Sequence, residues 1–285
     1  MSFRKTTVAA LLLAAAGAQA ATLDKIKETG SVSMGVRESS GAMSYTTGDG
    51  KFAGFHVDVC QQVLADIQKK LGMAKLDIKY QPVTSQNRIP LVQNGTVDIE
   101  CGSTTNNLGR QKDVAFAVTT YVTEVRIAVK ANSGITSIAQ LKDKTVATTT
   151  GTTSVQLLRK HERATGIDFK EVFGKDHSDS FLQLDSGRAD AFVMDDYILA
   201  GLIARSKNPA DFKIVGEPLS LEPIAIMLRK DDPAFKKAVD DSIIALMKSG
   251  ELTKILAKYN LTPGQDTKNA WANPNDKPAE DYVKK

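Results

Sequence analysis

The sequence predicts an α/β protein made of two similar lobes. Strand-like and helix-like segments alternate along the chain, and this alternation occurs twice without a visible sequence repeat. Alternating strands and helices are typical of mostly parallel sheets covered by helices. About 265 residues remain once the first twenty are set aside, which suits two lobes of roughly 100 to 150 residues. The hydrophobic content of 42% is enough to fill two cores.

The first twenty residues have the pattern of a signal peptide. Arg4 and Lys5 form a basic start, residues 8–16 are apolar, and Ala18-Gln19-Ala20 is a small-x-small cleavage pattern. A membrane anchor is the alternative, but the apolar run is much shorter than the roughly 20 residues that cross a bilayer. We therefore expect residues 1–20 to be removed on export and the mature protein to be soluble.

The charge of the mature chain argues against nucleic acid and membrane surfaces as partners. Without Arg4 and Lys5 the formal charge of +4 becomes +2, which provides no strong basic field. Electrostatic recognition is therefore expected at a local site.

The two cysteines, Cys60 and Cys101, permit a single disulfide in an oxidising compartment. The alternative is two buried free thiols, because cysteine is often a small core residue. Two cysteines without a histidine cluster do not predict a metal site.

The elements of the first unit follow from periodicity. Apolar residues at helical spacing predict a helix over 58–70, ended by Gly72, and short apolar or alternating runs predict strands. The predicted strands are 32–36, 76–80 and 97–101.

The second unit repeats this pattern from about Tyr121. Predicted strands are 125–129, 145–148, 191–194, 214–215 and 224–228, and predicted helical segments are 138–141, 155–166, 198–203, 235–246 and 252–256. The domain organisation that follows is a first lobe of residues 21–122 and 218–261, a second lobe of residues 123–217, and a polar extension, residues 262–285. This extension is expected to be either a surface segment or disordered, with Trp271 able to dock against a lobe.

Polar residues gather directly after the predicted strands. In open α/β sheets the ligand lies outside the carboxyl ends of the strands, so these residues are the site candidates. They are Arg37, Ser85, Arg88, Ser103, Thr105, Arg110, Thr153, His177 and Asp195.

These residue types suit a small molecule with two anionic groups and one cationic group. Guanidinium groups bind carboxylates in bidentate fashion, and free N–H groups at a helix amino terminus also accept anions. Asp195 suits an ammonium group. A dicarboxylic amino acid has this combination of charges.

Each candidate also has a simpler structural explanation. Arg37 or Arg88 could be a solvated surface residue, and His177 likewise. The segment from Ser85 to Asn87, and Thr153, could only cap helices. Asp195 could cap the next helix, with Asp196 an equally placed competitor, but Asp195 is preferred because it follows Met194 at the strand end.

Over roughly residues 23–261 the chain resembles the periplasmic glutamate/aspartate-binding proteins of ABC transporters, within the polar amino-acid-binding family. The resemblance is carried by Arg37-Glu38-Ser39-Ser40, Ser85-Gln86-Asn87-Arg88-Ile89-Pro90, Cys101-Gly102-Ser103-Thr104-Thr105-Asn106-Asn107 and Lys175-Asp176-His177. It implies a two-lobed periplasmic binding protein (Venus-flytrap) fold of type II, with the ligand in the cleft between the lobes.

The resemblance also implies the role of each site residue. Arg110, Ser103, Thr105 and the Thr153 amide would hold the α-carboxylate, and Asp195 would hold the α-ammonium. The side-chain carboxylate would contact Arg37, Arg88, Ser85 and His177.

The function so implied is capture of glutamate or aspartate in the periplasm and delivery to the membrane permease of an ABC transporter. We expect a monomer without cofactor, metal or catalytic activity. Two alternatives remain: a secreted dehydratase of amino-acid precursors, with His177 as general acid or base, and a soluble ligand-sensing domain. The sequence does not rank glutamate against aspartate.

Overall fold

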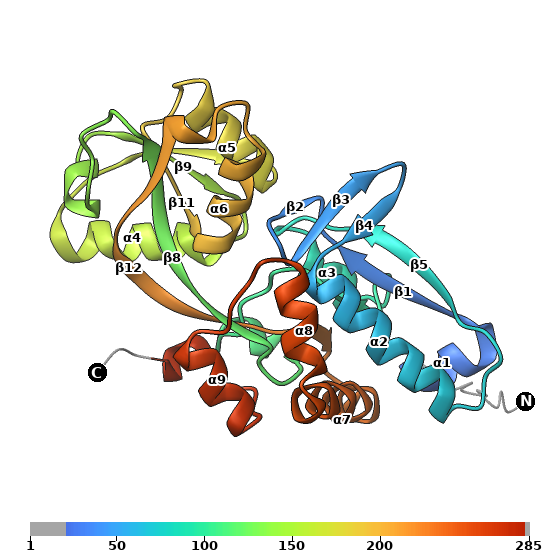
Figure 1. Cartoon of the computed structure of the whole chain (residues 1–285). Coiled ribbons are helices and arrows are strands. Elements are labelled where there is room, and N and C mark those ends of the chain that lie inside the picture. The colour runs from blue at the N-terminus through green and yellow to red at the C-terminus, as the bar shows by residue number, and fades with distance from the viewer. Residues whose placement is uncertain (1–20, 283–285) are drawn as a thin grey trace, which may run out of the picture.

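The computed structural model describes residues 21–282 and confirms the predicted two-lobed α/β architecture (Figure 1). One five-stranded sheet has the order β5-β1-β6-β13-β7 and defines the first lobe. A second has the order β10-β9-β11-β8-β12 and defines the second lobe. The predicted signal peptide lies outside the described residues.

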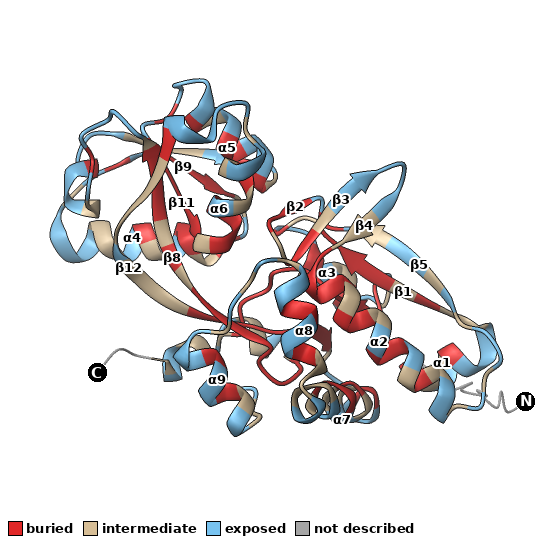
Figure 2. Ribbon diagram, in the orientation of Figure 1, coloured by how far each residue is buried: buried red, intermediate tan, exposed pale blue. Residues whose placement is uncertain are grey.

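In the first lobe, helices cover the faces of a sheet of short strands. Its strands are β1 (Ser31–Val36), β5 (Asp77–Pro82), β6 (Ile99–Glu100), β7 (Val114–Phe116) and β13 (Met227–Arg229), and its helices are α1 (Thr22–Thr29), α2 (Phe55–Lys70), α3 (Arg88–Gln93), α7 (Pro233–Ser249) and α8 (Glu251–Lys258). α2 buries Val59, Val63 and Ile67 at the spacing of one helical face, as its periodicity predicts (Figure 2).

The second lobe has the same construction. Its strands are β8 (Tyr121–Lys130), β9 (Thr145–Thr149), β10 (Lys170–Gly174), β11 (Ala191–Asp195) and β12 (Phe212–Ile224), and its α-helices are α4 (Thr153–Thr165), α5 (His177–Asp185) and α6 (Asp196–Arg205). Every residue of β11 is buried, which explains its continuous apolar run.

Four of the five strands in each sheet share one direction, as predicted, and one strand, β13 in the first lobe and β8 in the second, runs against them. β1 is parallel to β5 and β6, but β13 is antiparallel to β6 and β7, and β8 is antiparallel to β11 and β12. β8 carries the chain from the first lobe to the second and β12 carries it back. The two crossing strands therefore run in opposite directions, and neighbouring strands of opposite direction pair antiparallel.

The predicted lobe boundaries at 122/123 and 217/218 both lie inside these crossing strands. β12 leaves regular register with β8 between Val215 and Ser220, and Gly216 has a φ of 79° there. A bulge bends and twists a strand. The irregularity in β12 thus lies where the chain passes from one lobe to the other.

A small three-stranded sheet was not predicted from the sequence. It consists of β2 (Ser39–Ser40), β3 (Ser44–Gly48) and β4 (Lys51–Ala53). The strands are too short for a clear periodicity, although Gly48-Asp49-Gly50 is a hairpin signal. The sheet places Ser39 and Gly41 against the second lobe, as described below.

A disulfide joins Cys60 of α2 to Cys101 at the end of β6. The sequence separation of 41 residues corresponds to a loop whose closure stabilises a fold by about 4 kcal/mol in the chain-entropy account. Cys101 precedes the segment 102–105, which carries two of the predicted site residues. The bond therefore anchors this segment to a core helix.

The C-terminal extension is folded as far as Tyr282 and packs beside the crossing strands. It contains α9 (Gln265–Ala272) and a short 3-10 helix, η4 (Ala279–Asp281). The indole Nε1 of Trp271 donates to the Thr120 carbonyl at 2.9 Å, and Val122 N donates to Thr267 Oγ1 at 2.9 Å. Of the two expectations for this segment, the structure shows the ordered surface segment.

His56 is fully buried within α2. Its Nδ1 donates to the Gly102 carbonyl at 2.6 Å, and its Nε2 lies 2.6 Å from Thr120 Oγ1. Burial lowers the pKa of His56 to about 4, despite the hydrogen bond to Gly102. A neutral histidine therefore links α2 to the segment that carries the site.

This histidine should make the protein labile to acid. A folded-state pKa below the unfolded value means that its contribution is fully present above pH 6.5 and is lost as the pH falls towards 4. Between pH 7 and pH 5 it should cost about 2 kcal/mol of unfolding free energy. Urea unfolding of the wild type and His56→Gln at both pH values measures this, and an equal pH dependence in the two proteins would contradict it.

Candidate ligand site

One small pocket between the lobes is lined by eight of the nine predicted site residues. Its empty volume is about 220 Å³, including open solvent. The predicted residues that line it are Ser85, Arg88, Ser103, Thr105, Arg110, Thr153, His177 and Asp195. The first five belong to the first lobe and the last three to the second, so the lobes are closed on the pocket.

Arg88, the first residue of α3, is buried in the pocket wall with unpaired donors. Only 2% of its surface is exposed, and Nε and Nη1 have no hydrogen-bond partner among the described residues. Burial, and after it the charge of Arg110, lowers the pKa of Arg88 to about 9. A buried guanidinium with free N–H groups favours an anionic ligand.

Arg110 connects the two lobes. Its Nη1 donates to the Thr105 carbonyl of the first lobe at 2.8 Å, and its Nη2 donates to the Gly151 carbonyl of the second lobe at 3.2 Å. Desolvation lowers the pKa of Arg110, and the carboxylates of Glu222 and Asp195 oppose this shift. The guanidinium thus lies at the junction of the pocket and the closure contact.

Arg37 is fully buried behind the pocket rather than in its lining. Its Nη1 donates to Ser103 Oγ at 3.3 Å, and its Nη2 pairs with Asp176 Oδ1 at 2.6 Å across the lobes. Ser39 Oγ donates to the other oxygen of Asp176 at 2.6 Å. Burial raises the pKa of Asp176, but Arg37 and His177 outweigh burial and lower it to about 2.

His177 is held by hydrogen bonds on both ring nitrogens. Its Nε2 lies 3.3 Å from Nη2 of Arg37, and because a guanidinium can only donate, Nε2 accepts. Nδ1 then carries the proton and donates to Thr149 Oγ1 at 2.9 Å. Burial and the charge of Arg37 lower the pKa of His177 to about 3, so the ring is neutral.

Asp195 and Asp196 are separated clearly by the structure. Asp195 is buried in the pocket, with Tyr197 Oη donating to it at 3.3 Å, whereas Asp196 accepts from Thr123 Oγ1 and the Tyr197 amide outside the pocket. Burial and the charge of Glu222 raise the pKa of Asp195 to about 8. A cationic group would stabilise its ionised form.

The hydroxyl residues of the site next to α3 and α4 do not cap these helices through their side chains. Ser85 Oγ is buried without a partner among the described residues, and the N-cap of α3 is Asn87, which makes no side-chain cap hydrogen bond. At α4 the N-cap residue, Thr152, donates to the Thr149 carbonyl at 2.7 Å instead of accepting from the helix. The first N–H groups of α4 therefore remain available to an anion in the pocket.

Four residues of the site were not predicted from the sequence. Thr152, Met194 and Ile198 also line the pocket, and Asp176 holds Arg37 behind it. Asp176 stands next to His177 in one of the quoted motifs, so its position was a usable signal. Met194 and Ile198 read as ordinary core residues.

Two pairs of closely packed backbones border the closed lobes. Gly151 has a φ of +81°, and a Cβ there would lie 2.8 Å from Gln86 Cα of the first lobe. A Cβ on Gly201 of α6 would lie 3.0 Å from Gly41 Cα next to the small sheet. Side chains at these glycines would therefore oppose closure.

Gly201→Ala is expected to lower the affinity for the ligand without lowering the stability of the protein. Alanine is favoured over glycine in a helix by about 1 kcal/mol, so the unfolding free energy should not fall. The new methyl group meets Gly41 only when the lobes close, so ligand affinity should fall roughly tenfold. Calorimetric titration and urea unfolding measure the two effects. Gly264→Ala, with no atom near the added Cβ, is the matched control, and equal affinity in both variants would exclude this steric effect.

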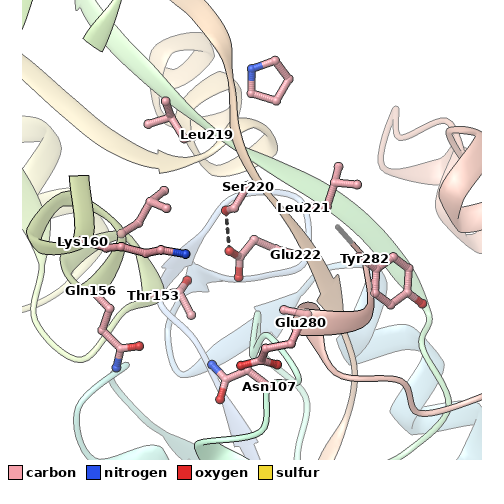
Figure 3. A pocket seen from close by; sticks show the side chains of 13 residues that line it. Asn107, Thr153, Gln156, Lys160, Leu219, Ser220, Leu221, Glu222, Glu280 and Tyr282 are labelled. Atoms are coloured by element: carbon pink, nitrogen blue, oxygen red, sulfur yellow. Dashed lines mark hydrogen bonds between the residues drawn. The ribbon is translucent and has the colours of Figure 1, made fainter. Parts of the chain in front are cut away.

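A larger groove adjoins the pocket on the side of β12, with Thr153 common to both (Figure 3). It is lined by α4, β12 and the C-terminal extension and holds about 1040 Å³, including open solvent. Glu222 points into it, with Oε1 accepting from Ser220 Oγ at 2.6 Å. The predicted charged residues gather in the smaller pocket and not in this groove.

Residues 21–282 contain no group of three or more His, Cys, Asp or Glu side chains that could hold a metal ion. None of the helices described is both long and apolar enough to cross a bilayer.

Comparison with known proteins gives a consistent result. The sequence profile of the bacterial extracellular solute-binding proteins, family 3, matches residues 32–262. The chain is 45% identical over 273 residues to the "Glutamate/aspartate import solute-binding protein" of Escherichia coli, covering 92% of this chain and 90% of that protein. It is 42% identical to the "L-glutamate/L-aspartate-binding protein" of Pseudomonas aeruginosa, covering 98% of each.

A solved structure shows the same architecture. A mutant of ArgBP from T. maritima superposes with a TM-score of 0.74 at 28% identity, covering 84% of this chain and 98% of the other. Together with the sequence matches, this likeness confirms the resemblance and the fold predicted from the motifs.

Proposed function

This chain belongs to the bacterial extracellular solute-binding proteins of family 3, and from this we propose that it captures L-glutamate or L-aspartate and delivers it to the permease of an ABC transporter. The observation that carries the proposal is the set of unmatched charges in one closed pocket. Arg88 has free donors, and Asp195 is a buried carboxyl group without a cationic partner at hydrogen-bond distance among the described residues.

In the proposed complex the ligand neutralises these groups. Arg110, Ser103, Thr105 and the Thr153 amide hold the α-carboxylate, and Asp195 holds the α-ammonium. The side-chain carboxylate is held by Arg88 and Ser85, with His177 in the adjoining pocket wall and Arg37 behind it. Each carboxylate so meets guanidinium and hydroxyl donors, which form short charge-assisted hydrogen bonds.

Ligand capture and lobe closure are the same event in this proposal. Ser85 and Arg88 approach the ligand from the first lobe, and Asp195 approaches it from the second. A ligand that contacts both lobes shifts the population towards the closed form. The closed surface is then presented to the permease. The predicted signal peptide and the disulfide support an extracytoplasmic location.

The catalytic alternative receives no support from the site. A dehydratase would need His177 as general acid or base. Both of its ring nitrogens are engaged, and its pKa is lowered to about 3. The relatives reported above are named as import or binding proteins.

A thermal-shift screen over the common amino acids tests the proposal. A ligand at 1,000 times its Kd stabilises the folded protein by about 4 kcal/mol, which corresponds to roughly 10 °C for a protein of this size. Glutamate and aspartate should give large shifts, and lysine and leucine little. The proposal fails if neither acidic amino acid raises the unfolding temperature.

A further inference from the structure

Glu100 is a buried carboxylate directly behind the predicted ligand pocket. It lies in β6, is 0% exposed, and does not line the pocket. Its Oε2 accepts from Thr104 Oγ1 at 2.7 Å, whereas its Oε1 has no hydrogen-bond partner among the described residues. Thr104 stands between Ser103 and Thr105, so this hydrogen bond connects the carboxylate to the site segment.

The backbone at Gly102 makes room for this carboxylate beside an arginine. A Cβ at position 102 would lie 2.1 Å from Glu100 Oε1 and 2.9 Å from Arg37 Cγ. Because residue 102 has no side chain, the carboxylate and the Arg37 stem both pack against it. The position of Glu100 is therefore built into the segment that carries the site.

The charge of Glu100 acts on the pocket arginines. It opposes the lowering of the pKa of Arg88 that burial and Arg110 cause, and it acts in the same sense on Arg110. The other carboxylates of the site are placed differently. Asp176 pairs with Arg37 only across the closed lobes, and Glu222 acts on Arg110 and Asp195 from the crossing strand.

We propose that Glu100 is a positioning residue that sets the charge of the ligand site, offsetting one of the three guanidinium groups that the first lobe contributes. In the closed form Asp176 pairs with Arg37, so the charge of Glu100 acts chiefly on Arg88 and Arg110, the two guanidinium groups that line the pocket. The inference rests on the proposed function. It makes Glu100 a determinant of the preference for a dicarboxylic ligand over its monoamide.

The test compares Glu100→Gln with Asp98→Asn, using glutamate and glutamine as ligands. Asp98 is a buried carboxylate of the same lobe that pairs with Lys25 at 2.7 Å, accepts from Ser33 N at 2.8 Å and does not line the pocket. In Glu100→Gln the uncompensated guanidinium groups should lower the unfolding temperature of the unliganded protein. They should also raise the ratio of the glutamate affinity to the glutamine affinity roughly tenfold. In Asp98→Asn stability should fall and the ratio should stay at the wild-type value.

An unchanged ratio in Glu100→Gln, in a wild type that binds glutamate, overturns the role of Glu100. A wild type that binds neither acidic amino acid overturns the proposed function instead. If Glu100→Gln does not fold, the double variant Arg88→Gln, Glu100→Gln removes one charge of each sign and should fold again. A double variant no more stable than Glu100→Gln contradicts the charge balance.

Discussion

Replacing Arg88 by methionine is expected to weaken glutamate binding by at least about 30-fold while leaving the unliganded protein about as stable as the wild type. Removing one partner of a buried charge pair costs 2 to 5 kcal/mol of binding free energy or more, which sets the size of the loss. The unliganded protein behaves differently, because Nε and Nη1 of Arg88 have no hydrogen bonds to lose.

Two effects on stability oppose each other in this variant. Methionine removes the energetic cost of burying the guanidinium charge, the same burial that lowers the pKa of Arg88. It also removes the attraction between that charge and Glu100. The unfolding free energy should therefore change by less than about 1 kcal/mol. Calorimetric titration gives the affinity and urea unfolding gives the stability.

The matched control is Arg159→Met. Arg159 is an exposed residue of α4 that pairs with Glu171 at 3.4 Å and lies 6.0 Å from the centroid of the Phe173 ring, outside the pocket. This variant should bind glutamate as the wild type does. An affinity of Arg88→Met within threefold of the control would remove Arg88 from the site.

Arg110→Ala should abolish measurable glutamate binding, with a loss of roughly 1,000-fold or more. This change removes a pocket guanidinium and also the hydrogen bond to the Gly151 carbonyl that joins the closed lobes. Both losses act on the liganded closed form, so they add in the binding free energy. Calorimetric titration with glutamate measures the effect.

Arg110→Lys distinguishes these contributions. Lysine keeps the positive charge but cannot form a planar fork with a carboxylate while also reaching Thr105 and Gly151. Its affinity should fall between those of the wild type and the alanine variant. Undiminished affinity in Arg110→Ala, in a protein that still unfolds cooperatively, would show that Arg110 does not hold the ligand.

The ligand class was already accessible from the order of the residues along the chain. Arg37, Arg88 and Arg110 each follow a strand of the first lobe, and Asp195 ends a strand of the second. Strand ends converge at one edge of a sheet, so a local pattern was sufficient to predict that these side chains approach one another. The core elements were equally accessible, because burial on one face leaves a periodicity in the sequence.

Other features depended on contacts between segments distant in sequence. The small sheet, the antiparallel direction of β13 and the packing of Trp271 on Thr120 have no periodic signal, because each depends on a partner supplied by another part of the chain. For the same reason, the sequence gives no sign that His56 is a buried link between α2 and Gly102.

The sequence by itself determined the two-lobed α/β class, the charged residue types of the site and the family resemblance, because these depend on patterns along one stretch of chain. Only the tertiary structure decided which charges are unmatched. It placed Arg37 behind the pocket with Asp176, separated Asp195 from Asp196, and brought Glu100 beside the arginines. Burial and distance determine the energy of a charge, and both arise only when the lobes fold and close.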